Sequence, residues 1–309
     1  MKILLNFKNK FNKKNSNKLG GVEVLNFNLY NNLKKKGYKI YTINDYKKKN
    51  FYEAIISSND ARIFNTVNAN KKILWLHNKL QIEKSIRKKQ FLSIMKNEIY
   101  SVFVSKYLEN ITTRLYNFKS RVVIPNFLDK KFENLKINFN RKPIVIWSVQ
   151  RDKGLSNTIK TWVEKVYSKN NNAELHIFAV NKFANKDMFR KYNIFFHGRV
   201  DKKTLIKYYS KASCMICLGY DETFCLNAIE AFACGTPVLS FKKTALNDLI
   251  VNNVNGFKVD NFTQIANKIN KLINLNKKQR KKIIMSTNKF STKYYFKKIE
   301  NKWINLLKL

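Results

Sequence analysis

Apolar and polar positions along the chain follow two periods, one typical of buried strands and one typical of amphipathic helices. Residues 1–7 form a short apolar run, and residues 22–36 carry Leu25, Leu29 and Leu33 on one helical stripe. A second strand follows this helix, so the chain begins as strand, helix, strand. Patterns of the same kinds predict strands at 38–43, 53–57, 72–77, 101–105 and 121–125, and helices at 81–95 and 106–117.

A second series of alternating elements begins at residue 143. It predicts strands at 143–149, 174–180, 194–196, 214–218, 237–241 and after a turn at 255–257, and helices at 156–167, 185–192, 202–210, 262–275, 277–288 and 291–309. Between the two series, residues 126–143 are polar and basic without periodicity, which is typical of a linker. The expected fold class is α/β, with two doubly wound, Rossmann-like parallel-sheet domains over residues 1–135 and 143–290.

Residues 219–241, GYDETFCLNAIEAFACGTPVLSF, place a carboxylate in apolar surroundings. Glu230 lies in a short helix that Gly235 and Pro237 end, and apolar or small side chains flank it on both sides. This helix should be mostly buried, and a buried carboxylate is unfavourable unless hydrogen-bond donors satisfy it. The hydroxyl groups of a bound ligand would supply such donors.

The start of the same helix favours an anion. Thr223 is expected to cap it. The free amides of Phe224, Cys225 and Leu226 would then point outward at the positive end of the helix dipole. Glu222 stands just before these amides, and the two carboxylates together suit a ligand with both hydroxyls and phosphate, such as a nucleotide sugar. For the pair alone, a surface Glu followed by a Glu that reaches out to solvent is an equally good interpretation.

The spacing Glu-x7-Glu of Glu222 and Glu230, the small-residue helix and Gly-Thr-Pro-Val at 235–238 resemble the signature of the retaining glycosyltransferases of family four. The resemblance implies the GT-B fold, with two Rossmann-like domains facing a cleft and helix 291–309 packing back on the first. It also implies that Glu222, a catalytic candidate, contacts the hydroxyls of the donor sugar. By the same resemblance Glu230 binds the ribose, and the amides between the two hold sugar and phosphate. The family usually has Gly where Cys225 stands, at the closest backbone approach to the sugar.

The segment after the first strand of the second domain resembles the family's diphosphate site. Lys153 precedes Gly154, where the family has a basic residue. Arg151 is expected to replace an arginine that the family carries upstream, where this chain has Ser148. Two cations near a helix start would neutralise a departing diphosphate without a metal. A solvated turn is the alternative for these residues alone.

Four further residues follow from the resemblance. Arg199, in the loop HGRV, is expected to lie by the nucleobase. Gly20 and Gly21 end a Lys-rich loop that resembles the family's approach to donor phosphate and acceptor, and a plain turn fits them equally well. His77, at the end of a strand, is the second catalytic candidate, as a contact to acceptor or sugar. A hydrogen-bonded core histidine is the alternative for His77.

The net charge of the chain adds two open alternatives. The 61 Lys and Arg residues against 20 Asp and Glu residues give +41, which by itself favours nucleic acid or an anionic membrane surface. The basic residues are scattered over expected turns and helix faces, and Lys, Asn, Ile, Phe and Tyr are abundant together, as expected from codons rich in A and T. Part of the charge is therefore attributed to composition. No nucleic-acid partner is expected, and peripheral contact with an anionic membrane stays open.

Cysteine usage and apolar runs bear on location and metals. The four cysteines all lie between Cys214 and Cys234 and form no disulfide framework. Cys214 and Cys217 stand three apart on an expected strand, hence on opposite faces, which disfavours a zinc or redox role. No apolar run has the length of a signal peptide or membrane span, so a cytoplasmic location is expected, at the inner face of the membrane if the basic surface binds it. No DxD triplet occurs, and neither a metal nor a cofactor is expected.

These features predict a metal-independent glycosyltransferase of hexosyltransferase type. It would move a sugar from a nucleotide-diphosphate donor to a hydroxyl acceptor, and the resemblance implies retention of configuration. Synthesis of bacterial cell-surface polysaccharide or of lipid-linked glycan is the expected role. A nucleotide-sugar 2-epimerase of the same architecture, and a basic protein that binds nucleic acid or a membrane surface, are the alternatives. The sequence determines neither the base, the sugar nor the acceptor.

Overall fold

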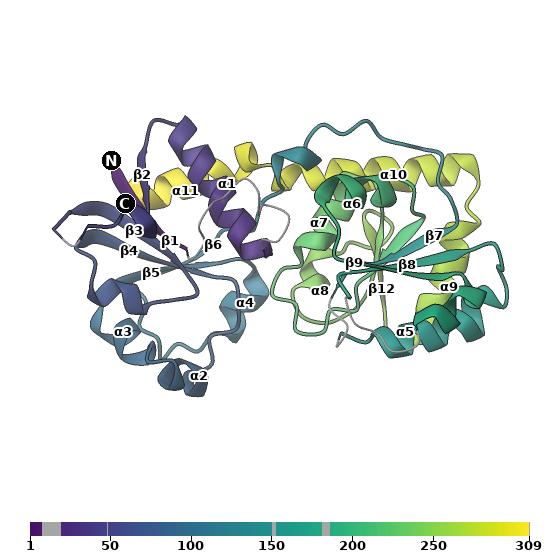
Figure 1. Cartoon of the computed structure of the whole chain (residues 1–309), viewed down its shortest axis with the longest axis horizontal. Helices are drawn as coiled ribbons and strands as arrows, with labels where there is room; N and C mark the ends of the chain where they lie inside the picture. Colours follow the sequence, from purple (N-terminus) through teal and green to yellow (C-terminus); the bar gives the residue numbers. More distant parts are fainter. Residues whose placement is uncertain (8–19, 48, 150–152, 181–185, 309) are drawn as a thin grey trace. The chain divides into compact units, whose positions relative to one another are not determined.

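Two six-stranded parallel sheets form the framework of the chain (Figure 1). The computed structural model describes residues 1–7, 20–47, 49–149, 153–180 and 186–308. The sheets belong to two units, of which unit 1 comprises Met1–Asp129 and Phe296–Leu309 and unit 2 comprises Lys130–Tyr295. The predicted α/β fold class is confirmed. The unit boundary lies at Asp129–Lys130, earlier in the chain than the boundary placed after residue 135 from the sequence.

The sheet of unit 1 is built from the apolar runs of the first half of the chain. Its strands are β1 (Lys2–Asn6), β2 (Lys39–Thr42), β3 (Tyr52–Ser58), β4 (Ala69–Leu76), β5 (Ile99–Phe103) and β6 (Ser120–Val123). They pair in the order β2-β1-β3-β4-β5-β6, and every pairing is parallel. Consecutive residues of a strand point to opposite faces, so the complete burial of Ile3, Leu4 and Leu5 shows that both faces of the sheet are covered at β1.

The helices of unit 1 follow the predicted pattern with two corrections. Helix α1 (Gly21–Lys35) buries Leu25, Leu29 and Leu33, as its apolar stripe predicts. The prediction of one helix over 81–95 is wrong: α2 (Ile82–Arg87) and α3 (Phe91–Lys96) are separate, and Lys89 between them has a φ of 55°, which no helix tolerates. Helix α4 (Lys106–Ile111) ends earlier than predicted, because Thr112 adopts an extended conformation.

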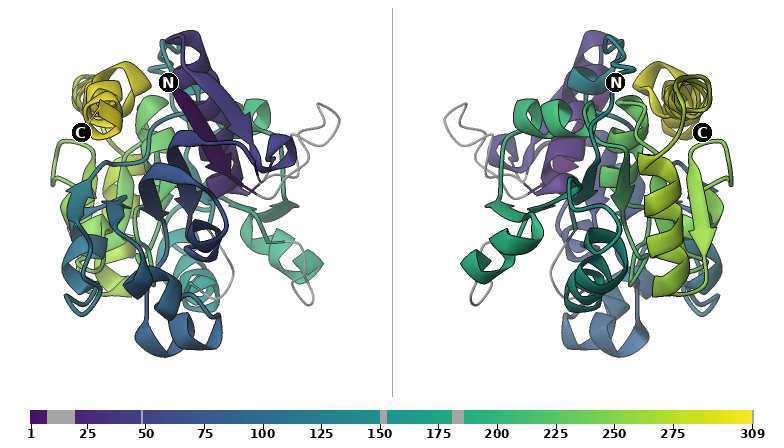
Figure 2. Two further views of the ribbon diagram at one scale, coloured as in Figure 1. Left: turned by 90° about the vertical axis from the view of Figure 1, so that its left-hand side faces the viewer. Right: turned by 90° about the vertical axis from the view of Figure 1, so that its right-hand side faces the viewer.

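The last helix, α11 (Phe296–Lys308), packs on unit 1 although it follows unit 2 in the sequence (Figure 2). The ring of Trp303 is fully buried and lies edge to face on Trp75, with 4.9 Å between the ring centroids. The ammonium of Lys71, on β4, donates to the carbonyl of Leu306 over 2.9 Å. Both ends of the described chain therefore belong to the same unit.

The sheet of unit 2 repeats the architecture with another strand order. Its strands are β7 (Ile144–Trp147), β8 (Glu174–Phe178), β9 (Ile194–Gly198), β10 (Cys214–Ile216), β11 (Val238–Phe241) and β12 (Gly256–Val259). They pair in the order β12-β11-β10-β7-β8-β9, again all parallel. This is the order of dinucleotide-binding Rossmann sheets, whose direction of winding reverses beside the first strand.

The helical segments of unit 2 cover both sides of this sheet (Figure 1). They are the 3-10 helices η4 (Lys130–Phe132), η6 (Lys186–Tyr192) and η7 (Thr292–Tyr294), α5 (Leu155–Thr161) with its π-helical continuation η5 (Trp162–Tyr167), α6 (Lys202–Tyr209), α7 (Leu226–Ala233), α8 (Leu246–Leu249), α9 (Phe262–Ile273) and α10 (Lys277–Ser291). The helix predicted at 156–167 is thus α-helical only in its first half. The one predicted at 185–192 is a 3-10 helix.

The segment 126–143, predicted as a linker, contains a buried cation. Arg141 is 6% exposed, and its guanidinium donates to the carbonyls of Tyr209, at 2.7 Å, and Cys234, at 2.6 Å. These carbonyls lie at the carboxyl ends of α6 and α7. Burial lowers the pKa of Arg141 to about 10, so the group stays charged at neutral pH. Arg141 therefore ties the ends of two helices together.

Candidate functional site

The carboxyl ends of β7 and β10 form the topological switch point of the second sheet. The two strands are neighbours, and the chain continues from β7 to β8 on one side and from β10 to β11 on the other. In doubly wound sheets, ligands bind at such a point. The loop after β7 leads to Lys153 and the loop after β10 carries Glu222. Two residues that the sequence analysis selected separately thus meet at this point.

Lys153 and Glu222 form an ion pair at the switch point. The Lys153 Nζ donates to Glu222 Oε1 over 2.6 Å, and the two side chains are 18% and 15% exposed. Burial lowers the pKa of Lys153, but the hydrogen bond and charge of Glu222 outweigh it, and the pKa lies above its usual value. Lys153 is therefore a charged, half-buried cation that can neutralise phosphate.

Helix α7 begins beside this pair, later than predicted. The prediction that Thr223 caps the helix is wrong, because the residue at the cap position is Cys225, with φ 73° and ψ 81°. Such a left-handed conformation is natural for Gly and strained for other residues. A Gly, which the resemblance implies at this position, would adopt the conformation without strain. Phe224, whose amide was expected to face a ligand, packs its ring against Tyr294.

The first turn of α7 is fixed to the end of β7. The Asn227 side-chain amide donates to the carbonyl of Ser148, just after the strand. Ser148 therefore contributes its backbone, in a place where the resemblance implies an arginine side chain. The amides of Leu226 and Asn227 open the helix, so the positive end of its dipole lies near the Lys153–Glu222 pair. This combination favours an anionic ligand.

Glu230 is buried in the middle of α7, as its surroundings predict. It is 4% exposed, and the ammonium of Lys202, the first residue of α6, donates to its Oε1. Donors to Glu230 were expected from the sequence, but Lys202 was not among the candidates. No local signal identifies it, because Lys202 stands 28 positions away at an ordinary helix start. The ion pair offsets part of the cost of burying the carboxylate.

Two cysteines lie beside Glu222. The Sγ atoms of Cys217 and Cys225 are 3.4 Å apart, and a carboxylate oxygen of Glu222 lies within 4.8 Å of both. Among the described residues, this is the group of side chains whose types and distances suit a metal ion. The partner of Cys217 is thus Cys225 and not Cys214.

The loop expected near the nucleobase leads to a histidine pair. His197 Nε2 lies 2.8 Å from His176 Nδ1, and His176 Nε2 lies 2.8 Å from a carboxylate oxygen of Glu174. Burial, with a smaller effect of His176, lowers the pKa of His197 to about 4. The pattern of the sequence did not indicate this contact of His176. Arg199 directly follows β9, which carries His197, and is exposed. Arg151 lies outside the described residues.

The remaining predicted site residues belong to unit 1. His77 follows β4, is 4% exposed, and donates its backbone N–H to Asn59 Oδ1 over 2.8 Å. Burial lowers the pKa of His77 to about 3, so its imidazole is neutral at pH 7. Helix α1 begins at Gly21, and Gly20 is its N-terminal cap residue. The backbone N–H of Gly20 donates to the Glu23 carboxylate. A phosphate at this amide would have to displace Glu23.

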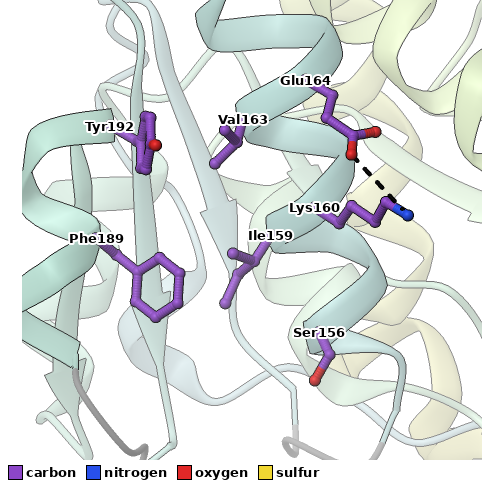
Figure 3. Close-up of a pocket in the computed structure, with 7 residues that line it drawn as sticks. All are labelled: Ser156, Ile159, Lys160, Val163, Glu164, Phe189 and Tyr192. Carbon is purple, nitrogen blue, oxygen red and sulfur yellow. Dashed lines mark ion pairs between the residues drawn. The ribbon is translucent and has the colours of Figure 1, made fainter.

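A cavity of about 460 Å³ lies elsewhere in unit 2 (Figure 3). Phe189 and Tyr192 face Ile159 and Val163 across it, and Lys160 and Glu164 form an ion pair of 4.0 Å at its side. None of the predicted site residues lines it. The switch point, rather than this cavity, carries the candidate chemistry.

Comparison with solved structures identifies the fold. The sucrose-phosphate synthase of Thermosynechococcus elongatus superposes with a TM-score of 0.74 at 16% identity, over 99% of this chain and 98% of that one. The S. aureus protein TarM, solved in complex with Fondaparinux, alpha-GlcNAc-glycerol and UDP, gives a TM-score of 0.66 at 21% identity. That match covers 82% of this chain and 55% of TarM. The two units therefore have the GT-B fold.

Sequence comparison identifies the family. The D-inositol 3-phosphate glycosyltransferase of Xylanimonas cellulosilytica is 34% identical over 70 residues, which are 23% of this chain and 17% of that enzyme. The family model for glycosyl transferases group 1 matches residues 129–290, just over half of the chain. This match includes the switch point, the Lys153–Glu222 pair and the whole of α7. The chain belongs to the group 1 glycosyl transferases.

Proposed function

We propose that the chain moves a sugar from a nucleotide-diphosphate donor to a hydroxyl group of an acceptor, with retention of configuration and no metal in the transfer step. The observation that carries the proposal is the Lys153–Glu222 ion pair at the switch point of unit 2, beside the first turn of α7. A cation and a carboxylate in contact match the two parts of such a donor, its diphosphate and its hydroxyl-bearing sugar.

Donor binding would exchange the partners of this ion pair. The diphosphate oxygens accept hydrogen bonds from Lys153, and the sugar hydroxyls donate to Glu222. Both groups are only partly exposed, so the exchange takes place where electrostatic interactions are stronger than in water. During transfer, Lys153 and the amides at the start of α7 stabilise the charge that develops on the departing diphosphate. We assign the same role to Arg151.

Glu230 would hold the ribose of the donor. Its carboxylate is paired with the ammonium of Lys202 in the protein interior. Hydroxyl groups that donate to a charged acceptor form strong hydrogen bonds. Arg199 would lie near the base. A sugar nucleotide thus spans the site from α7 to the end of β9.

We assign contacts with the acceptor to unit 1. The neutral imidazole of His77 can donate one hydrogen bond and accept another, which suits a sugar hydroxyl. Gly20 and Gly21 are assigned to the same side. The acceptor class is a glycan or a lipid-linked glycan, and the role is cell-surface polysaccharide or glycolipid synthesis in a bacterium. TarM, solved with UDP and glycan-type ligands, supports this assignment.

A peripheral contact with an anionic membrane is a second part of the proposal. The neighbouring helices α2 and α3 expose Ile86, Leu92 and Met95, at 57%, 65% and 47%. The same segment, 82–96, exposes five cations: Lys84, Arg87, Lys88, Lys89 and Lys96. Apolar side chains among cations are typical of surfaces that lie in a membrane interface. Among the described helices, none is long and apolar enough to cross the membrane.

Vesicle sedimentation tests this contact. The chain should sediment with vesicles containing phosphatidylserine and less with neutral ones, and Leu92→Glu should weaken the binding. Equal vesicle binding by the variant and the parent chain would show that α2 and α3 do not form the membrane contact.

A panel of nucleotide sugars tests the transfer. Each is first screened for thermal stabilisation of the chain, and the best donor is then used in turnover assays. Lys153→Ala should lower kcat by roughly 10²–10³-fold, the usual effect of removing one group that stabilises the leaving charge. Glu230→Ala should weaken nucleotide binding and abolish turnover. Glu164→Gln, on η5 and away from the switch point, is the matched control and should retain both.

Two results would contradict the proposal. The first is normal turnover and nucleotide affinity in the Glu230→Ala variant. The second is conversion of the donor to an epimer in the absence of any acceptor, which would indicate a 2-epimerase. The matched family and relatives are transferases and do not support that alternative.

A further inference from the structure

Two buried thiols and a carboxylate converge between β10 and α7. Cys217 directly follows β10 and Cys225 precedes the first residue of α7, so the loop between them brings the two thiols together. The side chains are 1% and 7% exposed, and their Sγ atoms lie 3.4 Å apart. Glu222, from the same loop, places a carboxylate oxygen within 4.8 Å of both sulfur atoms.

We propose that Cys217, Cys225 and Glu222 bind a soft divalent cation of the Zn²⁺ type. Thiolates bind Zn²⁺ at about 2.3 Å, so two of them in a tetrahedral site lie about 3.8 Å apart. The observed 3.4 Å requires an adjustment of only a few tenths of an ångström. Two thiolates and one carboxylate oxygen leave the fourth position of the cation open, for water or a ligand oxygen.

Lys153 makes this site electrically neutral. Two thiolates and one carboxylate against a dication leave a single negative charge, which the Lys153 ammonium compensates. Glu222 has two oxygens, so one can accept the 2.6 Å hydrogen bond from Lys153 while the other binds the cation. Outer partners of this kind orient carboxylate ligands in metal sites. The cation therefore need not displace Lys153.

The bound cation would inhibit the enzyme rather than assist it. It would occupy Glu222, keep Lys153 beside it and fix Cys225 at the start of α7. A sugar donor needs the same groups, so cation and donor should exclude each other. This consequence rests on the proposed function, whereas binding of the cation does not.

Cobalt titration tests the site directly. The full chain is reduced, freed of metal with a chelator and titrated with Co²⁺, whose thiolate complexes have a charge-transfer absorption. We expect one equivalent to bind per chain and Zn²⁺ to displace it. Cys217→Ser should abolish the absorption, and Glu222→Gln should weaken Co²⁺ binding at least tenfold. Cys214→Ser and Cys234→Ser, which alter the other two buried thiols, are matched controls and should bind Co²⁺ like the parent chain.

Cys225→Gly is the variant least at risk of misfolding. Gly adopts the φ of 73° at this position without strain, so the variant should fold, which circular dichroism checks, and should bind no Co²⁺. The proposal is overturned if the parent chain gives no charge-transfer absorption, or if the absorption survives in both Cys217→Ser and Cys225→Gly. It is also overturned if peroxide joins the two cysteines in a disulfide while the reduced chain binds no Co²⁺.

A competition experiment separates this proposal from the proposed function. At a free Co²⁺ concentration fixed by a metal buffer, the preferred nucleotide sugar should lower cobalt occupancy in the parent chain. Retained cobalt binding without competition would contradict the donor site at Glu222 and leave the cation site standing.

Discussion

Arg141 is a buried cation at the carboxyl ends of two helices, and its removal should weaken unit 2. Its guanidinium donates to the last-turn carbonyls of α6, through Tyr209, and of α7, through Cys234, at 2.7 and 2.6 Å. It also donates to the Thr236 hydroxyl over 3.1 Å. Carbonyls at a helix end have no partner within the helix and carry the negative end of its dipole. Arg141 satisfies both requirements for α6 and α7 at once.

The change Arg141→Met removes the charge and keeps most of the side-chain volume. Each hydrogen bond from a charged donor contributes roughly 1.5–3 kcal/mol to stability. The burial cost of the guanidinium, which also disappears, offsets part of the loss. We therefore expect the free energy of unfolding of unit 2 to fall by about 3 kcal/mol. For a unit of this size, that corresponds to a decrease in Tm of roughly 6–12 °C.

Hydrogen exchange measured by mass spectrometry can follow the two units separately. Amides of β10 and β11, which exchange through unfolding of unit 2, should exchange roughly a hundredfold faster in the variant. Amides of β4 in unit 1 are the internal reference, and Arg190→Met, at an exposed arginine of unit 2, is the control. Unchanged exchange in β10 and β11 would refute the reasoning, and so would an equal effect of Arg190→Met.

Three further predictions follow from buried groups. Lys202→Met should lower the free energy of unfolding by roughly 3 kcal/mol, because Glu230 stays buried without its cation. Glu230→Gln in the same chain should restore much of this loss in urea unfolding. Additive losses from the two changes would contradict the ion pair. His77 has a pKa of about 3 in the folded chain against 6.5 unfolded, so only the unfolded chain gains a proton as pH falls through this window, and stability should drop by about 1.4 kcal/mol per pH unit. In acid unfolding, His77→Phe should lower the slope by this amount and leave the contribution of His197, whose pKa is lowered to about 4; an unchanged slope would exclude His77 as a source. Trp303→Ala should lower the free energy of unfolding by roughly 3–5 kcal/mol and expose α11 to limited proteolysis, because the ring is buried against Trp75. Continued resistance to the protease would show that α11 docks without this ring.

Local patterns in the sequence determined the elements and the fold class. Strands such as β1 and β7 are short apolar runs, and α1 shows its buried stripe at helical spacing. Lys153 was a candidate through the family resemblance, and Glu222 because it stands just before the amides that open a helix. A parallel sheet gathers its functional loops at one edge, which is consistent with their meeting there. The burial of Glu230 was also predictable, since apolar side chains surround it on nearly every face of α7.

Tertiary structure alone decided which side chains became partners. Lys202 reaches Glu230 from 28 positions away, Arg141 reaches Cys234 from 93 positions away, and Cys217 meets Cys225 across a loop. The left-handed conformation of Cys225 moved the start of α7 beyond the cap that local propensity favours. The hydrophobic periodicity of a segment shows only which face of a helix or strand is buried. Which side chains become partners depends on the order of the strands and on where each loop ends. For this reason the sequence predicted where the site lies, and packing decided which charges and thiols meet in it.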